Sequence, residues 1–100
     1  MALGIYWSPR ALKRFHAVIN YLEKNWGKVV VEDFVKRTEL LLQTLAIQPK
    51  MFRSVSKTQD IREAVFTKHN LMIYKIAKEK IILLTFFDSR QHPKKKLRES

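Results

Sequence analysis

Two stretches in the first half of the chain carry apolar residues at helical spacing. Ser8 and Pro9 predict the start of the first helix, because serine is a good N-cap and proline is tolerated at the first helical position. The apolar pattern continues to Trp26, and Gly27 is a typical residue for a helix end. The residues of this stripe are Leu12, Phe15, Ile19, Leu22 and Trp26.

The second helix is predicted to begin near Lys28 and to end at Gln48-Pro49. Its apolar stripe consists of Val31, Phe34, Val35, Thr38, Leu41, Leu42 and Leu45. Very few residues separate the two helices, so we expect them to pack as an antiparallel hairpin. A hairpin of two helices buries too little apolar surface alone, so the rest of the chain must supply a surface for it to cover.

Four further stretches have the composition of strands. Gly4-Ile5-Tyr6-Trp7 is short, and residues 61–67, 71–76 and 80–87 follow one another closely enough to predict an antiparallel meander. Residues 81–87 are apolar at almost every position, which predicts an interior strand buried on both faces. Residues 50–60 are polar and without periodicity, and we interpret them as a loop.

The predicted order is therefore β-α-α-β-β-β. It indicates an α+β fold in which an N-terminal helical hairpin packs on a mostly antiparallel four-stranded sheet. A chain of 100 residues has room for one core, so we expect a single domain over residues 1–100, with about residues 94–100 as a basic tail.

Composition narrows the class of protein. Apolar residues make up 46% of the chain, as in ordinary globular proteins, and cysteine is absent, which excludes disulfides and thiolate metal sites. No segment has the length of a membrane span and the N-terminus does not resemble a signal peptide, so we expect a cytoplasmic protein with no membrane partner. His16, His69 and His92 have no metal-ligand spacing, and we expect neither a metal nor a cofactor.

The charge is strongly positive and uneven. Twenty Lys and Arg against nine Asp and Glu give a formal net charge of +11. Residues 1–47 hold seven basic and four acidic residues, a net of +3, whereas residues 48–100 hold thirteen and five, a net of +8. Such an excess favours nucleic acids, acidic proteins or acidic membrane surfaces as partners.

The motifs along the chain resemble those of the RelE/ParE superfamily of toxins from type II toxin–antitoxin systems. The resemblance extends from Tyr6 to Lys96, and it depends on the order of the motifs rather than on any one of them. The motifs are Trp7-Ser8-Pro9-Arg10-Ala11-Leu12, Tyr21-Leu22-Glu23-Lys24-Asn25-Trp26-Gly27, Leu45-Ala46-Ile47-Gln48-Pro49, Ile61-Arg62-Glu63, Leu71-Met72-Ile73-Tyr74 and Phe87-Asp88-Ser89-Arg90-Gln91-His92-Pro93.

This resemblance implies a small toxin that a cognate antitoxin neutralises by wrapping around it. RelE-like members cut messenger RNA on the ribosome, whereas ParE-like members inhibit DNA gyrase. Because the two groups share a fold, only the site residues can distinguish them.

The ribonuclease cluster that the resemblance implies is incomplete in this chain. Arg62 and Arg90 match two of its basic positions, but Ala64, Leu71 and Lys96 stand at the positions expected for Lys, Arg and Tyr. His92 could serve as a general acid or base, since an unperturbed histidine has a pKa of about 6.5. The catalytic candidates, for a RelE-like enzyme only, are thus Arg62, Arg90 and His92, and enzymatic activity stays open.

These gaps favour a ParE-like toxin acting on DNA gyrase. The alternatives are a RelE-like ribonuclease acting on ribosome-bound mRNA, a non-toxic basic module that binds nucleic acid, and a degenerate toxin that only binds its antitoxin. The candidates for contact with the target or the antitoxin are Arg62, Lys68, Arg90, Lys94, Lys95 and Lys96.

Two of these side chains, and Tyr74, also have plainer interpretations. Arg62 could be solvated, or it could pair with a neighbouring carboxylate of Asp60 or Glu63. Arg90 and Asp88 could form a surface ion pair, which contributes little to stability. Tyr74 alternates with apolar neighbours and is better explained as a core ring than as a catalytic hydroxyl.

Overall fold

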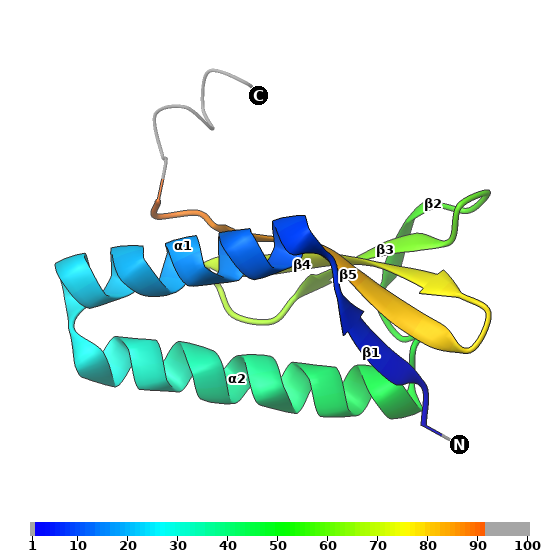
Figure 1. Ribbon diagram of the computed structural model, residues 1–100, viewed down its shortest axis with the longest axis horizontal. Coiled ribbons are helices and arrows are strands. Elements are labelled where there is room, and N and C mark those ends of the chain that lie inside the picture. Colours follow the sequence, from blue (N-terminus) through cyan, green and yellow to red (C-terminus); the bar gives the residue numbers. More distant parts are fainter. Residues whose placement is uncertain (1, 92–100) are drawn as a thin grey trace.

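A helical hairpin lies across one face of a five-stranded sheet in the computed structural model, which describes residues 2–91 (Figure 1). The predicted α+β fold class is confirmed. The elements, in chain order, are β1 (Gly4–Trp7), α1 (Pro9–Trp26), α2 (Lys28–Ile47), β2 (Arg53–Ser56), β3 (Ile61–Val65), β4 (Asn70–Ala77) and β5 (Lys80–Asp88).

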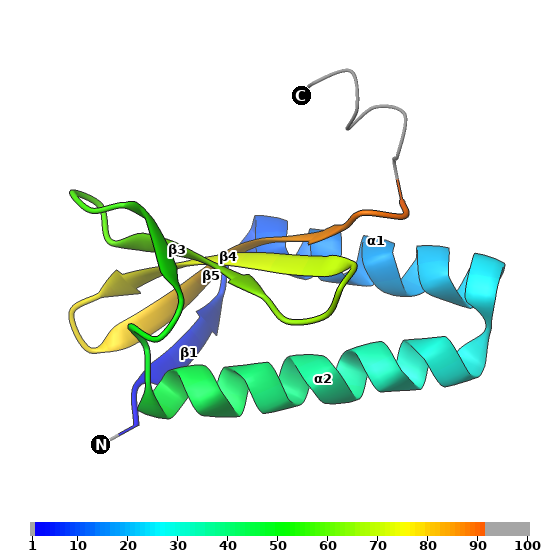
Figure 2. The same ribbon diagram turned by 180° about the vertical axis from the view of Figure 1, so that it is seen from behind.

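The strand order across the sheet is β1-β5-β4-β3-β2. The four strands from β2 to β5 form an antiparallel meander, and β1 pairs with the first half of β5 in parallel. Seen from behind in Figure 2, the sheet twists away from the helices and leaves its second face open. The interior position predicted for β5 is confirmed, because β1 and β4 flank it.

One element differs from the prediction. Residues 53–56, expected in a loop, form the short edge strand β2, so the sheet has five strands instead of four. The sequence of this strand gives little indication of it, since Val55 is its one apolar residue and Arg53 and Val55 are both exposed. Instead, Arg53 lies opposite Glu63 of β3, and their side chains form an ion pair at 3.5 Å.

The predicted ends of α1 are confirmed. The Ser8 hydroxyl accepts a hydrogen bond from the Ala11 amide at 3.0 Å, which satisfies one of the free N–H groups at the helix start. At the other end, Gly27 has a φ of 95°, a backbone conformation that residues with a Cβ rarely adopt. The chain can therefore reverse into α2 without an intervening loop.

The buried stripe of α1 is rotated from the predicted one. Ala11, Val18 and Leu22 are buried, whereas Leu12 and Trp26 are 47% and 55% exposed. The side chain of Ala11 is small, so the helix backbone can approach the sheet closely on this side. The side of α1 that carries Ala11, Val18 and Leu22 therefore faces the core. The stripe predicted for α2 agrees better, since its buried residues Phe34, Thr38, Leu41 and Leu45 all belong to it.

The core lies between the hairpin and the helix-facing side of β4 and β5. Met72, Tyr74, Ile81 and Leu83 are fully buried there. Aromatic rings extend the core along α1, with ring centroids 5.1–6.5 Å apart. These rings belong to Trp7, Phe15, Phe34, Phe66 and Phe86.

The prediction that residues 81–87 are buried on both faces is wrong for the second face. Ile82, Leu84 and Phe87 of β5 are only half-buried, and Val65 of β3 is 64% exposed. The reason is that both helices cover the same side of the sheet (Figure 1). An antiparallel sheet usually presents polar residues on its open face, so this apolar face is unusual.

Candidate functional site

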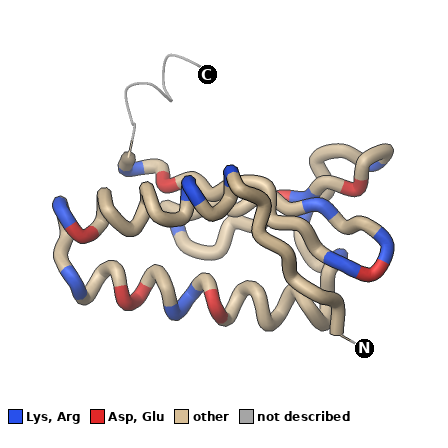
Figure 3. Tube along the Cα trace, in the orientation of Figure 1, with Lys and Arg blue, Asp and Glu red and all other residues tan. Residues whose placement is uncertain are grey.

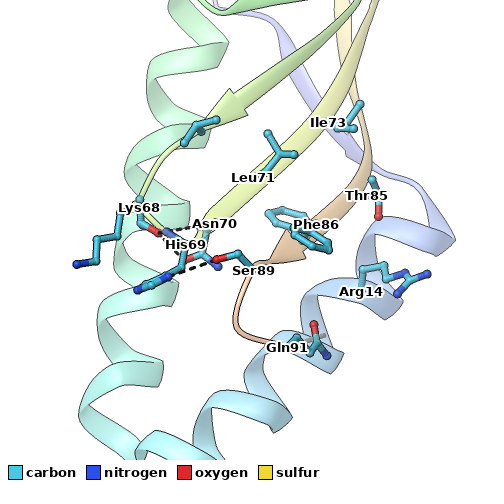
Figure 4. A pocket seen from close by; sticks show the side chains of 13 residues that line it. Arg14, Lys68, His69, Asn70, Leu71, Ile73, Thr85, Phe86, Ser89 and Gln91 are labelled. Atoms are coloured by element: carbon cyan, nitrogen blue, oxygen red, sulfur yellow. Dashed lines mark hydrogen bonds between the residues drawn. The ribbon is translucent and has the colours of Figure 1, made fainter. Parts of the chain in front are cut away.

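A groove of about 570 Å³ follows the open face of the sheet between β3, β4 and β5 (Figure 4). We call it the sheet groove. Its floor is built from side chains that point away from the helices, because they alternate with the core residues along each strand. The floor residues are Val65, Leu71, Ile73, Thr85 and Phe87.

Two polar walls border this apolar floor. On one side α1 contributes Arg14, because α1 runs beside the second half of β5, beyond the point where β1 ends. On the other side the turn between β3 and β4 contributes Lys68 and His69. A contact of 3.3 Å between His69 Nδ1 and the Ser89 hydroxyl connects this turn to the end of β5 (Figure 4).

The sheet groove has the character of a surface for binding another chain. Contiguous exposed apolar side chains mark interaction sites on soluble proteins, and a polar rim is typical of such interfaces. Arg14 and Lys68 are exposed, and neither forms an ion pair with an acid among residues 2–91. The arrangement fits a peptide segment that combines apolar and acidic side chains.

Arg62 is not in the sheet groove. It pairs across the sheet with the buried Tyr74, so it belongs to the helix-facing side. Its guanidinium contacts Asp60 at 3.3 Å and donates to the carbonyl of Phe52 at 2.8 Å. Only 17% of the side chain is exposed. Arg62 therefore holds the segment after α2 against the sheet.

Arg90 is also occupied. Its Nε and Nη2 atoms donate to both carboxylate oxygens of Asp88, at 3.0 and 2.8 Å, and its guanidinium lies 5.6 Å from the ring centroid of Trp26. Asp88 is fully buried, so this is not the weak surface pair that the sequence suggested. The bidentate pair fixes Arg90 to the end of β5. The contact with Trp26, together with a hydrogen bond of 2.8 Å from the Tyr21 hydroxyl to the Arg90 carbonyl, holds this segment against α1.

The carboxylate of Asp88 is held in its charged form. Burial acts to raise its pKa, but hydrogen bonds from the Arg90 side chain and backbone and from the Asn70 amide outweigh that effect. The pKa of Asp88 consequently lies below its ordinary value. The Asn70 contact is short, at 2.7 Å, and joins the start of β4 to the end of β5.

The described positions of the implied ribonuclease cluster, which are Arg62, Ala64, Leu71 and Arg90, do not meet at one place. The cross-strand partners of Arg62 and Asp88 lie four residues apart on β4, which is about 13 Å of strand. Ala64 is fully buried on the helix-facing side, whereas Leu71 lies on the floor of the sheet groove.

Tyr74 lies in the core, as predicted. Burial raises its pKa to about 12, despite the nearby positive charge of Arg62. The hydroxyl donates to the carbonyl of Pro49 at 2.7 Å, so it ties the end of the helical hairpin to the sheet.

Of the three residues predicted to contact a partner that lie within residues 2–91, which are Arg62, Lys68 and Arg90, only Lys68 lies at the sheet groove. His92 and Lys94, Lys95 and Lys96 lie outside the described residues. The distribution of charge along the chain indicated neither Arg14 nor the apolar floor. The sequence did contain a signal for the floor, which is the lack of alternation in β4 and β5. When helices cover only one side of a sheet, apolar side chains on its other face lie at the surface.

No group of three His, Asp, Glu or Cys side chains in residues 2–91 could hold a metal ion. None of the described helices is long and apolar enough to cross a membrane.

The fold is shared with toxins of known structure. A chain of the "Chromosomal ParDE TA system from P. aeruginosa" superposes with a TM-score of 0.71 at 11% identity, over 87% of this chain and 96% of the other. The YoeB dimer structure from Staphylococcus aureus gives 0.60 at 15% identity, over 87% and 97%. The E. coli DinJ-YafQ toxin-antitoxin complex gives 0.60 at 11% identity, over 90% and 96%.

Sequence comparison identifies the family. No curated protein matches the chain in sequence. The sequence model of the family described as "ParE toxin of type II toxin-antitoxin system, parDE" matches residues 5–93, which is most of the chain. The chain therefore belongs to the ParE toxin family of type II toxin–antitoxin systems.

Proposed function

We propose that this protein is a growth-inhibiting toxin that a cognate antitoxin neutralises by covering the sheet groove. Membership of the ParE toxin family gives the class of function. The observation that supports the mode of neutralisation is the open apolar floor at Val65, Leu71 and Ile73, bordered by the cations Arg14 and Lys68. Antitoxin side chains would supply the missing apolar cover and the opposite charge.

A growth experiment tests this proposal. Induced expression of the chain alone should arrest growth of a bacterial host. Co-expression with a small acidic protein encoded beside the gene should restore it. Normal growth at confirmed soluble expression would contradict the toxin proposal, and it would instead favour a degenerate toxin or a basic nucleic-acid-binding module.

For the cellular target, the proposal is DNA gyrase. The supporting observation counts against RNA cleavage. Arg62 and Arg90 are each bound to a carboxylate, and the β4 partners of Arg62 and Asp88 are four residues apart, about 13 Å of strand. A cluster that stabilises a pentavalent phosphate needs cations that converge on one point. These two do not converge in the described structure.

Ribosome-dependent mRNA cleavage is the rival, because the YoeB and YafQ structures share this fold. Incubation of the purified chain with ribosomes stalled on a defined message tests it. Cleavage by the chain, lost in the His92→Ala variant, would support the rival and assign His92 a role. An intact message together with inhibited gyrase would dispose of it.

A further inference from the structure

The first half of α1 carries three cations that have no acidic neighbour. Arg10, Lys13 and Arg14 are all exposed, and residues 1–22 contain neither Asp nor Glu. We call these three residues the α1 basic row. Figure 3 shows blue and no red in this half of the helix.

The other described arginines all have acidic partners. Arg37, Arg53, Arg62 and Arg90 each form an ion pair with an Asp or Glu. Within residues 2–91, Arg10 and Arg14 are the two arginines without such a pair. They lie one helical turn apart, so their charges are adjacent and repel each other.

The position of the row on the helix also opposes stability. The N-terminus of a helix carries partial positive charge and favours anions, yet the first turn of α1 contains Arg10 and no acid. Positive charge in the first turn of a helix is unfavourable, and the fold does not pair it with an acid. This arrangement indicates a role in binding a negatively charged partner.

The surroundings of the row distinguish a nucleic acid from an acidic peptide. The large apolar side chains that α1 exposes are Leu12 and Trp26. At about 100° per residue both point to the flank of α1 away from the row. A peptide interface needs apolar anchors at its centre, whereas phosphates need only cations at close spacing. Arg10 and Lys13 have neither Leu12 nor Trp26 on their side of the helix, and only Arg14 borders the apolar floor of the sheet groove.

We propose that the α1 basic row binds the phosphodiester backbone of a nucleic acid, independently of base sequence. This site is distinct from the apolar floor of the sheet groove, although Arg14 borders both. The proposal does not depend on whether gyrase is the target. A toxin that carries such a row can contact the nucleic acid held by the enzyme or particle that it inhibits.

The test is the salt dependence of binding, measured with full-length protein made by cell-free synthesis. Fluorescence anisotropy would follow a labelled 20-base-pair DNA duplex and, separately, a single-stranded RNA of the same length. The test variant is Arg10→Gln/Lys13→Gln/Arg14→Gln. The matched control, Lys36→Gln/Lys57→Gln/Lys78→Gln, removes three exposed charges elsewhere. Circular dichroism and thermal melting would verify that both variants fold.

We expect the wild-type protein to bind at least one of the two nucleic acids with affinity that falls steeply as salt rises. In the test variant the slope of log K against log[salt] should decrease by about 2 to 3, since each phosphate contact contributes about 0.7–0.9. At 100 mM salt its affinity should be at least tenfold weaker. The control should change the slope by less than about 1. The affinities for the DNA and RNA probes would then show which of the two nucleic acids the row prefers.

Three results would overturn the proposal. The wild-type protein could fail to bind either probe at 50 mM salt. Both variants could lose binding equally, which would indicate a diffuse charge effect. A polyglutamate peptide could bind through the row while neither nucleic acid does, which would assign the row to an acidic protein partner.

Discussion

Arg90 is held between a buried carboxylate and an indole ring, so its charge serves the fold. The sequence places an arginine after an apolar strand, which suggests an anion site, but it does not reveal that Asp88 turns inward. Arg62 likewise serves the fold, since its guanidinium contacts Asp60 and two backbone carbonyls. Both carboxylates are two residues from their arginine, so the sequence suggested both pairs. It did not reveal the burial of Asp88, or the contacts with Trp26 and with the carbonyl of Phe52, because these depend on residues distant in the chain.

Loss of the Asp88 carboxylate should destabilise the protein. Asp88→Asn would leave the Arg90 guanidinium without its bidentate acceptor, at a cost of about 2–3 kcal/mol in the free energy of unfolding. Because the pKa of Asp88 is lowered by folding, its contribution is present above the ordinary Asp pKa and is lost as pH falls below it. Urea denaturation between pH 3 and 7 should show a smaller acid loss in the variant than in the wild type.

Tyr74 has the opposite pH behaviour. Its pKa is raised to about 12, so its neutral hydroxyl supports folding below pH 10, and that support is lost between pH 10 and 12. Tyr74→Phe should cost about 1–2 kcal/mol at pH 7, because the Pro49 carbonyl loses its buried donor. Chemical denaturation across alkaline pH would measure both effects. An unchanged stability at pH 7 would mean that water replaces the hydroxyl.

Among the elements, the sequence predicted the helices and the three long strands well, because periodicity and end residues such as Ser8 and Gly27 are local signals. The edge strand β2 was missed, since its stability comes from pairing with β3 and not from its own residues. The rotation of α1 was missed for a related reason: an alanine in the buried arc is a weak hydrophobic signal, although its small size positions the helix.

The junction between α1 and α2 should be sensitive to a single methyl group. Gly27→Ala meets no atom within 4 Å of its Cβ, so any cost comes from the backbone conformation at φ 95°. We expect a loss of about 1–3 kcal/mol in thermal or urea unfolding. Gly4→Ala is the control, because its Cβ would meet only the exposed Tyr6 ring, which can move. Equal losses for both variants would contradict this account of the junction.

The open face of the sheet should tolerate polar substitution in the free protein. Leu71→Gln/Ile73→Gln replaces two half-buried floor residues, and we expect a change below about 1 kcal/mol in stability, as for surface sites. Antitoxin affinity, measured by calorimetry, should fall at least tenfold, and growth should no longer be rescued. Ile82→Gln, on the same face but outside the sheet groove, should retain rescue. Rescue of the double variant would place the antitoxin elsewhere.

At the scale of the whole molecule, the fold class and the family followed from the order of elements and motifs, and the comparisons confirm both. The functional surface followed less well. A net charge of +11 pointed to the second half of the chain, but there the described arginines are paired with acids. The apolar floor of the sheet groove depends on both helices covering one face of the sheet, and the unpaired cations of α1 depend on which described arginines form ion pairs. Neither is a property of a local sequence pattern.

The measurement that tests the central proposal most directly is a parallel assay of the two targets with one preparation of the full chain. DNA gyrase would be assayed for supercoiling of a relaxed plasmid, and stalled ribosomes for cleavage of their message. We predict that supercoiling is inhibited, that the message stays intact, and that adding the antitoxin restores supercoiling. A cleaved message with supercoiling unaffected would contradict the proposal and identify a ribonuclease.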